Sequence, residues 1–328
     1  MKLFIAITVA AIYGLTIRFL YGLMGNVMPI MSISFFFLAP FSIGYLTTFL
    51  IPYRQNQTAT AAFFKPALTC LAIMAVTMAL NMEGDVCWFM AFPLFVIIAG
   101  VGGLIAFNRK KRRAIGQEQW DFDKDDWNKP GALKVSFLLL TPLLAGLIEG
   151  DRMSGYEAIT VERHIDLPAP PGLVWNTLMK KERPSAAGSH HFSIVGLLGF
   201  PHHLSTTLDQ PVVGGSRIAR YEKGLTFMET ITRIDPQRSL TLKITNDPST
   251  ISKAIMDEHI VIGGRHIKML EDQYQLTPLS DGKTELTLSS QFCINTPFNW
   301  YAGLWAKWLM SDIIGEELQG LQQAAEAP

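Results

Sequence analysis

Long apolar runs fill the first third of the chain. Four of them, about 3–23, 28–51, 66–82 and 86–107, come close to the roughly 20 apolar residues that a helix needs to cross a bilayer. A segment in lipid has to satisfy its backbone polar groups internally, which favours helices. The pattern therefore predicts an all-α membrane region with four transmembrane helices over residues 1–108.

A fifth apolar segment, Val135–Ile148, stands behind a polar stretch that begins with the basic run 109–113. It is short for a crossing, unless Lys134 snorkels to the interface and lengthens it. We predict a fifth crossing here and keep a re-entrant or interfacial helix as the alternative. Residues 109–150 are thus expected to form a charged loop followed by this short segment.

From about Ile159 the pattern changes to alternating apolar and polar positions with turn residues between them. A period of two is typical of half-buried strands. A helix is expected to begin at Pro170 and Pro171, and we assign no element to 183–205. The predicted strands are Ile159–Asp166, Ser216–Tyr221, Leu225–Ile234, Ser239–Thr245, Arg265–Pro278 and Thr284–Cys293.

The chain finishes with apolar residues at helical spacing. Thr296 is a candidate N-cap, with Pro297 at the first helical position. The expected apolar face consists of Trp300, Tyr301, Leu304, Trp305, Trp308, Ile314, Leu318 and Leu321. Strand, helix, antiparallel meander and long helix together predict an α+β domain over residues 151–328, in which a curved antiparallel sheet wraps the last helix.

Part of this domain resembles the START-like superfamily (SRPBCC), which includes the polyketide cyclase/dehydrase-like helix-grip proteins. The resemblance covers about 158–322 and lies in Ile165–Leu178, Ile231–Pro236, Arg238–Leu240, Tyr274–Thr284 and the C-terminal helix. It implies a helix-grip fold with a cavity between the sheet and the last helix, which the superfamily uses for lipids, sterols, polyketides and other apolar ligands. The superfamily shares no single set of catalytic residues, so none is carried over.

Charge refines this picture of the membrane half. The whole chain has 28 basic and 28 acidic residues, but residues 1–108 contain only six charged side chains. Basic residues in the 52–65 connection and in 109–113 predict a cytoplasmic N-terminus by the positive-inside rule. A multi-pass protein of the cell membrane is expected, with its C-terminal domain on the non-cytoplasmic side if the fifth segment crosses. The balanced charge gives no argument for a nucleic-acid partner.

Metal and cofactor chemistry find little support in the sequence. The pairs His190-His191 and His202-His203 have no carboxylate or cysteine at ligand spacing, so we expect no metal site. The phosphate-binding, dinucleotide-binding, serine-hydrolase and zinc-protease motifs are missing, so no cofactor is expected and the common enzyme classes that use these motifs are excluded.

One strand carries the main chemical ambiguity. In Leu225–Ile234 the side chains of Phe227, Glu229 and Ile231 share one face. If that face lines the cavity, Glu229 is a carboxylate among apolar neighbours, with a raised pKa and some capacity to move a proton or orient a ligand. If the face of Met228 is inward instead, Glu229 is a solvated surface acid.

The leading hypothesis is a membrane-tethered domain that binds a lipid or another apolar small molecule. Its alternatives are a cyclase- or hydrolase-like enzyme, with Glu229 or His259 as the catalytic group, and a ligand sensor or interaction module coupled to the membrane helices. The tryptophans of the last helix either pack on the sheet, roof the cavity or touch the membrane surface. The expected ligand-binding residues are Phe227, Glu229, Ile231, Tyr274, Tyr301, Trp305 and Trp308. Lipid bilayer and apolar ligand are the expected partners, and the sequence does not predict an oligomeric state.

Overall fold

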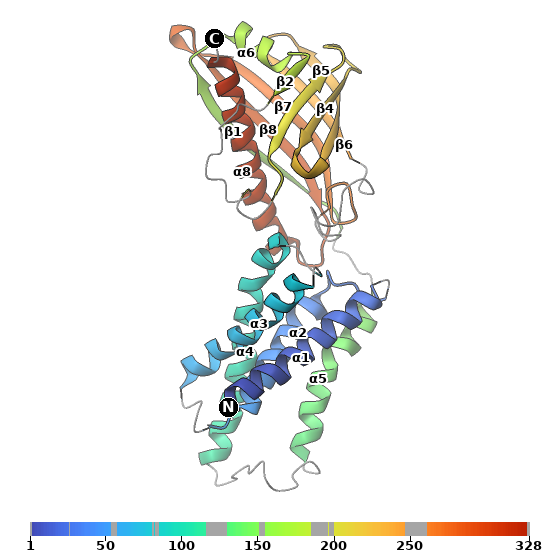
Figure 1. Ribbon diagram of the computed structural model, residues 1–328, viewed down its shortest axis with the longest axis vertical. Coiled ribbons are helices and arrows are strands. Elements are labelled where there is room, and N and C mark those ends of the chain that lie inside the picture. Colours follow the sequence, from blue (N-terminus) through green and yellow to red (C-terminus); the bar gives the residue numbers. More distant parts are fainter. Residues whose placement is uncertain are drawn as a thin grey trace. The chain divides into compact units, whose positions relative to one another are not determined.

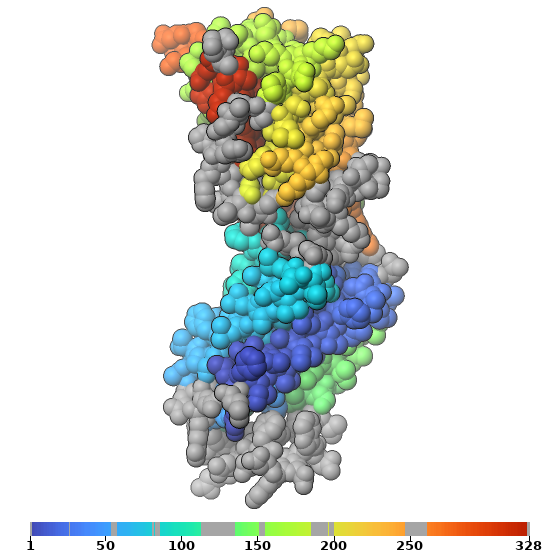
Figure 2. All heavy atoms as spheres, in the orientation of Figure 1, coloured from blue at the N-terminus to red at the C-terminus, as the bar shows by residue number. Residues whose placement is uncertain are grey.

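The protein is described by a computed structural model over residues 2–25, 27–53, 58–80, 82, 85–115, 130–150, 155–184, 196, 200–246 and 261–326. It divides near residue 153 into two compact units, one helical and one built on a sheet. Figure 1 shows the elements of each unit, and Figure 2 shows that heavy atoms fill the gaps between the ribbons within each unit.

The first unit is entirely helical. Its elements are α1 (Lys2–Leu23), a π-helical turn (Ser34–Leu38) that runs into α2 (Ala39–Leu50), α3 (Ala59–Ala79), α4 (Asp85–Ile115) and α5 (Pro130–Glu149). Among the described residues, three helices are long and apolar enough to cross a membrane, namely Lys2–Leu23, Ala59–Ala79 and Val86–Arg112. The apolar helices Ser34–Leu50 and Val135–Glu149 are shorter. Four or five crossings therefore stay a prediction.

Helix α3 begins earlier than the predicted span 66–82. Thr58 caps its N-terminus by accepting a hydrogen bond from the backbone N–H of Ala61. Pro66 lies inside the helix and cannot donate to the carbonyl four residues before it, that of Ala62. The Thr48 hydroxyl lies 3.4 Å from that oxygen and takes the missing donor's place. This contact explains how the helix continues through Pro66, the first residue of the predicted span.

Helix α5 is fastened to the same unit around its own proline. Pro142 frees the carbonyl of Leu138, and the Ser42 hydroxyl donates to that oxygen at 3.2 Å. The Tyr21 hydroxyl donates to the carbonyl of Pro142 at 2.6 Å. At the end of α5 the Glu149 carboxylate accepts from two backbone N–H groups, 2.7 and 2.9 Å away, at the start of the π-helical turn. The short fifth segment is thus an integral part of the helical unit.

The second unit is one antiparallel sheet of eight strands with a long helix on it. The strand order is β1-β8-β7-β6-β5-β4-β3-β2, and the sheet curls around α8 (Figure 1). The strands are β1 (Glu157–Leu167), β2 (Glu182–Pro184), β3 (His203–Leu208), β4 (Ser216–Tyr221), β5 (Thr226–Asp235), β6 (Ser239–Thr245), β7 (Ile267–Pro278) and β8 (Thr284–Ile294). The helices are α6 (Pro171–Leu178) and α8 (Asn299–Glu326).

This is the helix-grip arrangement expected from the sequence, with β2 and β3 added. All six predicted strands are present within a few residues of their predicted bounds. The main core lies between the sheet and the C-terminal half of α8, where the predicted positions Ile314, Leu318 and Leu321 are buried.

The N-terminal half of α8 presents a different face to the sheet from the one predicted. Trp300 and Leu304 are each 63% exposed. The small residues Gly303 and Ala306 face the sheet instead, against a cluster that includes Phe292 of β8. A helix with small residues at its contact can lie closer to its partner, so the bulky aromatic residues are left on the outside.

Candidate functional site

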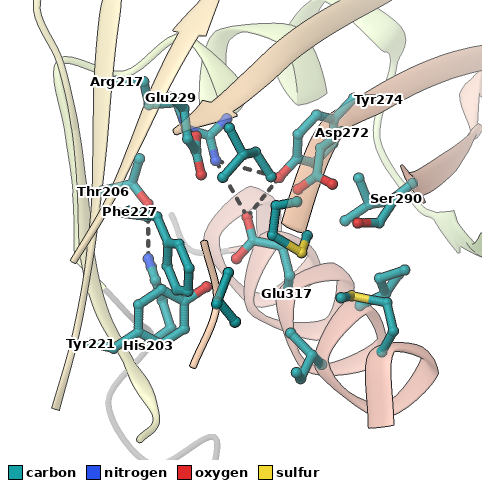
Figure 3. A pocket seen from close by; sticks show the side chains of 18 of the residues that line it. His203, Thr206, Arg217, Tyr221, Phe227, Glu229, Asp272, Tyr274, Ser290 and Glu317 are labelled. Carbon is teal, nitrogen blue, oxygen red and sulfur yellow. Dashed lines mark hydrogen bonds and ion pairs between the residues drawn. The ribbon is translucent and has the colours of Figure 1, made fainter. Parts of the chain in front are cut away.

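A cavity of about 70 Å³ lies inside the second unit, between the sheet and α8. Figure 3 draws the side chains of 18 residues around it, and the ten that are labelled come from β3, β4, β5, β7, β8 and α8. They are His203, Thr206, Arg217, Tyr221, Phe227, Glu229, Asp272, Tyr274, Ser290 and Glu317. Apolar side chains, among them Phe200, Ile262 and Met269, complete the wall. Ionisable groups are unusually frequent for an interior, which marks this place as the candidate site.

Arg217 and Glu229 form the first ion pair of the site. They are register partners on β4 and β5, and Nε of Arg217 lies 2.9 Å from Oε2 of Glu229. Both side chains are buried, whereas Met228 beside them is 55% exposed. The face of Phe227, Glu229 and Ile231 is therefore the inward one, which decides the ambiguity left by the sequence. Burial raises the pKa of Glu229, and Arg217 opposes that rise.

Glu317 on α8 brings a second acid to the same arginine. Its Oε1 lies 3.6 Å from Nη2 of Arg217 and forms a short ion pair with Arg183. Burial alone would raise the pKa of Glu317, but Arg183, His203 and Arg217 outweigh burial and lower it to about 2. Glu317 is therefore a carboxylate at every physiological pH.

Tyr274 connects these groups. Nη2 of Arg217 donates to the Tyr274 hydroxyl at 3.3 Å, and that hydroxyl donates to Oε1 of Glu317 at 3.1 Å. The guanidinium carbon of Arg217 lies 5.4 Å from the centre of the Tyr274 ring, within the range of a cation–π contact. Burial raises the pKa of Tyr274, so the phenol stays neutral and able to donate.

Among the acids described at the cavity, Asp272 is the one that forms no ion pair of its own. Burial raises its pKa to about 7, Ser290 on the neighbouring strand opposes that rise, and the nearby charge of Glu229 adds to it. Arg183 pairs with Glu317, and Arg217 pairs with Glu229 and Glu317, so both arginines are engaged by the other two acids. Among the described residues, no hydrogen-bond partner reaches Asp272 Oδ1, Ser290 Oγ on the neighbouring strand, or Arg217 Nη1. Two acceptor-capable oxygens and one donor are thus left around the cavity.

His203 lies at another part of the cavity wall. Its Nε2 is 2.8 Å from the Thr206 hydroxyl, and its ring packs edge-on against Tyr221. Burial lowers the pKa of His203, with Glu317 opposing that effect. Within the described residues, no group of three or more His, Cys, Asp or Glu side chains is placed to hold a metal ion.

The structure brings only part of the expected ligand-binding set together. Phe227, Glu229 and Tyr274 line the cavity, whereas Ile231 packs in the neighbouring core. Tyr301, Trp305 and Trp308 do not belong to its lining; their rings contact one another edge to face along the N-terminal half of α8. These three residues lie outside the cavity because the N-terminal half of α8 turns Gly303 and Ala306, and not its aromatic residues, toward the sheet. His259, like His190 and His191, lies outside the described residues.

Four important side chains were not expected from the sequence: Arg183, Arg217, Asp272 and Glu317. Arg183 and Glu317 meet only through the curl of the sheet around α8, for which the sequence holds no local signal. Arg217 reaches the site through the register of the hairpin around Glu222–Gly224, which places it directly across from Glu229.

No protein-family model and no curated protein matches the sequence. Among solved structures, a truncated norcoclaurine synthase from Thalictrum flavum is similar at 8% identity and a TM-score of 0.35, over 53% of this chain and 97% of that one. An aromatase/cyclase from Streptomyces sp. R1128 is similar at 14% identity and a TM-score of 0.34, over 52% and 94% of the two chains. A protein of unknown function from Staphylococcus aureus is similar at 13% identity and a TM-score of 0.34, over 52% of this chain and 95% of that one. Similarity of this size carries no argument about function, which has to come from the side chains around the cavity.

Proposed function

We propose that this chain is a membrane-held binding protein whose sheet-and-helix domain takes up a small molecule with a compact polar group. The membrane helices hold the domain beside the bilayer, on the non-cytoplasmic side if α5 crosses. The ligand's polar group enters the charged end of the cavity, and its apolar part contacts Phe200, Phe227 and Met269. A sensor role, in which occupancy is passed to the helices, stays a prediction of the sequence.

One observation carries the proposal: the unused hydrogen-bonding atoms at the cavity. Arg217 Nη1, Asp272 Oδ1 and Ser290 Oγ are buried, and no partner among the described residues satisfies them. A buried polar atom without a partner costs about 1–3 kcal/mol, and more when it is charged. Several such atoms around one cavity are therefore expected to be satisfied by something that enters it, either water or a ligand.

The size of the cavity favours a small ligand over a lipid. At about 10–15 Å³ for each water-sized group, a cavity of 70 Å³ holds roughly five such groups. Pockets for drug-sized ligands are about 300–1,000 Å³. An acyl chain or a sterol thus needs more room than the described residues leave, while the polar end of a small amphipathic molecule fits. We accordingly replace the lipid of the leading hypothesis by a small amphipathic molecule.

The test is to purify the full-length chain from membranes in mild detergent and to identify bound compounds by mass spectrometry after extraction. Ser290→Leu fills the cavity and removes one of the unused atoms. Ser289→Leu is the matched control, because the same side chain is then placed on the other face of the same strand. We expect one compound, near equimolar, in the wild type and in Ser289→Leu but not in Ser290→Leu. Equal amounts in all three, or no compound in any, would count against the proposal.

A second candidate function, proton transfer, is favoured by Asp272. This carboxyl has a pKa of about 7, is buried at the cavity and has an oxygen to spare. A group that titrates near the working pH is well suited to general acid–base catalysis. Glu229, the acid expected from the sequence, is less suited because Arg217 already holds it.

Incubation of the extracted compounds with the protein in heavy water separates the two candidates. An enzyme of this kind introduces deuterium at a carbon atom of the compound, and Asp272→Asn abolishes that exchange while the compound still binds. A compound that is bound but never exchanged identifies a binding protein without this chemistry.

A further inference from the structure

The N-terminal half of α8 carries a stripe of large apolar side chains on its outer face. Trp300, Leu304 and Trp308 recur every four residues and therefore lie on one side of the helix. They are 63%, 63% and 36% exposed. The cavity does not use them, and the sheet contacts the opposite face through Gly303 and Ala306.

The same end of the domain is where the chain arrives from the membrane helices. The backbone N–H of Gly155 donates to Asn295 Oδ1, and the side chain of Asn299 donates to the carbonyl of Gly155, each at 3.1 Å. Asn299 is the first residue of α8, directly before Trp300. The start of the aromatic stripe is thus fixed beside the attachment point of the domain.

The length of the connection limits how far this end can be from the bilayer. Helix α5 ends at Glu149, and five Cα–Cα steps lead from Gly150 to Gly155. At ~3.6 Å for each step, they span at most about 18 Å. The stripe starts next to Gly155, so this short reach keeps it near the membrane interface whether α5 crosses the bilayer or lies along it.

The surroundings of the stripe suit an interface between lipid and water. Tyr156 is exposed beside the attachment point, and Nζ of Lys268 lies 4.3 Å from the centre of its ring. The Tyr156 hydroxyl reaches the carbonyl of Arg265, whose side chain is also exposed. Tyr and Trp rings are enriched at the headgroup level because each has an apolar body and a polar group. Basic side chains beside them are attracted to the lipid phosphates. Among the described residues beside Gly155, Glu157 is an exposed acid.

We infer that this end of the domain, the stripe Trp300, Leu304 and Trp308 together with Tyr156, docks on the surface of the bilayer. The partner is the lipid headgroup and upper acyl region. The docked stripe holds the domain in a fixed orientation on the membrane, in place of a domain that swings on its connection. This inference rests on the membrane helices and is independent of what the cavity binds.

The experiment uses the full-length chain in phosphatidylcholine nanodiscs, with its three native cysteines replaced. A single environment-sensitive fluorophore is attached at Leu304→Cys. Leu173→Cys is the matched control, because it is another exposed leucine on a helix, α6, beyond the opposite end of β1. Quenching is measured with a nitroxide lipid in the disc and with iodide in the water.

We expect the lipid to quench the label at 304 and iodide to quench the label at 173, with at least a threefold preference in each direction. Replacing Trp300 by Ser in the Leu304→Cys protein should increase iodide quenching at 304. A label at 304 that iodide reaches as well as the one at 173 would overturn the inference. So would a label that neither quencher reaches, because a second copy of the chain then covers the stripe.

Discussion

Arg217 lies directly across from Glu229 on adjacent strands, and its Nε is 2.9 Å from Oε2 of that acid in the interior of the domain. Moving two charges from water into a protein interior costs several kcal/mol for each ion, and the attraction between them repays this only when the geometry is good and the remaining atoms are bonded. One guanidinium nitrogen, Nη1, is left over at the cavity. The pair is therefore poorly explained by stability alone and well explained by a ligand that completes it.

Replacing only one partner of this ion pair should destabilise the domain more than replacing both partners. Glu229→Gln leaves the Arg217 cation without its nearest acid, and we expect a loss of about 3–5 kcal/mol in the free energy of unfolding. The double variant Arg217→Met with Glu229→Leu should recover much of that loss, since Glu317 keeps Arg183. Chemical unfolding, followed by the circular dichroism of the sheet, measures both. Strictly additive effects would contradict the coupling.

The ion pairs of Glu317 predict how the stability of the domain changes at acidic pH. Its pKa is about 2 in the folded protein and 4.5 in an unfolded chain, so its contribution to stability is fully present above pH 4.5 and is lost as the pH falls through 2. Glu317→Gln should lower the melting temperature at pH 7 and show a smaller loss between pH 4.5 and 2 than the wild type.

Glu316→Gln serves as the control for this variant, because Glu316 is half-buried and lies 3.7 Å from the His202 ring instead of contacting the arginines. Melting curves should place it close to the wild type. A Glu316→Gln variant as unstable as Glu317→Gln would show that the arginine contacts do not matter.

Asp272 gives the opposite pH dependence. Its pKa is raised from 3.8 to about 7, so the folded state holds a proton that the unfolded chain has lost. The contribution of this group to stability is present below pH 3.8 and disappears as the pH rises through 7. Asp272→Asn, which is always neutral, should therefore stabilise the domain at pH 8 by a few kcal/mol and have little effect near pH 4. Melting curves at both pH values check this, and a stabilisation that is the same at both would disprove the assignment.

Gly303 tests which face of α8 packs on the sheet. A Cβ added there meets Ile159 and Ile294 at 3.5 Å, which is ordinary contact, and alanine is the better helix former by about 1 kcal/mol. Gly303→Ala should thus raise stability slightly, whereas Gly303→Leu should lower it by about 1–3 kcal/mol because the core is overfilled. If Gly303→Leu were tolerated and Leu304→Ser were costly, the face predicted from the sequence would be the right one.

The strands of the domain could be predicted because their alternation and their turns agree. The register of the site hairpin could not be predicted in the same way. A two-residue turn at Lys223-Gly224 would pair Arg217 with Thr230, whereas the turn that forms is the three-residue Glu222–Gly224, which is centred on residue 223 and pairs Arg217 with Glu229. β3 was missed because its Ser205-Thr206-Thr207 segment has no apolar alternation.

The face of α8 that packs on the sheet could not be predicted from hydrophobic spacing in the N-terminal half of the helix. Trp300, Leu304 and Trp308 repeat at helical spacing, so hydrophobicity alone assigns them to the core. The side with Gly303 and Ala306 packs on the sheet because small residues allow the helix and the sheet to approach closely. A hydrophobicity scale gives these two residues low values, so it does not assign them to the core. The contacts of Glu317 with Arg183 and Tyr274 depend on the curl of the sheet around α8, which no local pattern encodes.

An experimental density map of the cavity, from the full-length protein purified out of its own membranes, tests the central claim most directly. We predict density for an organic molecule in contact with Arg217 Nη1, Asp272 and Ser290. Ordered water alone at these three atoms, in protein saturated with its own membrane extract, would contradict a ligand-binding role for the site.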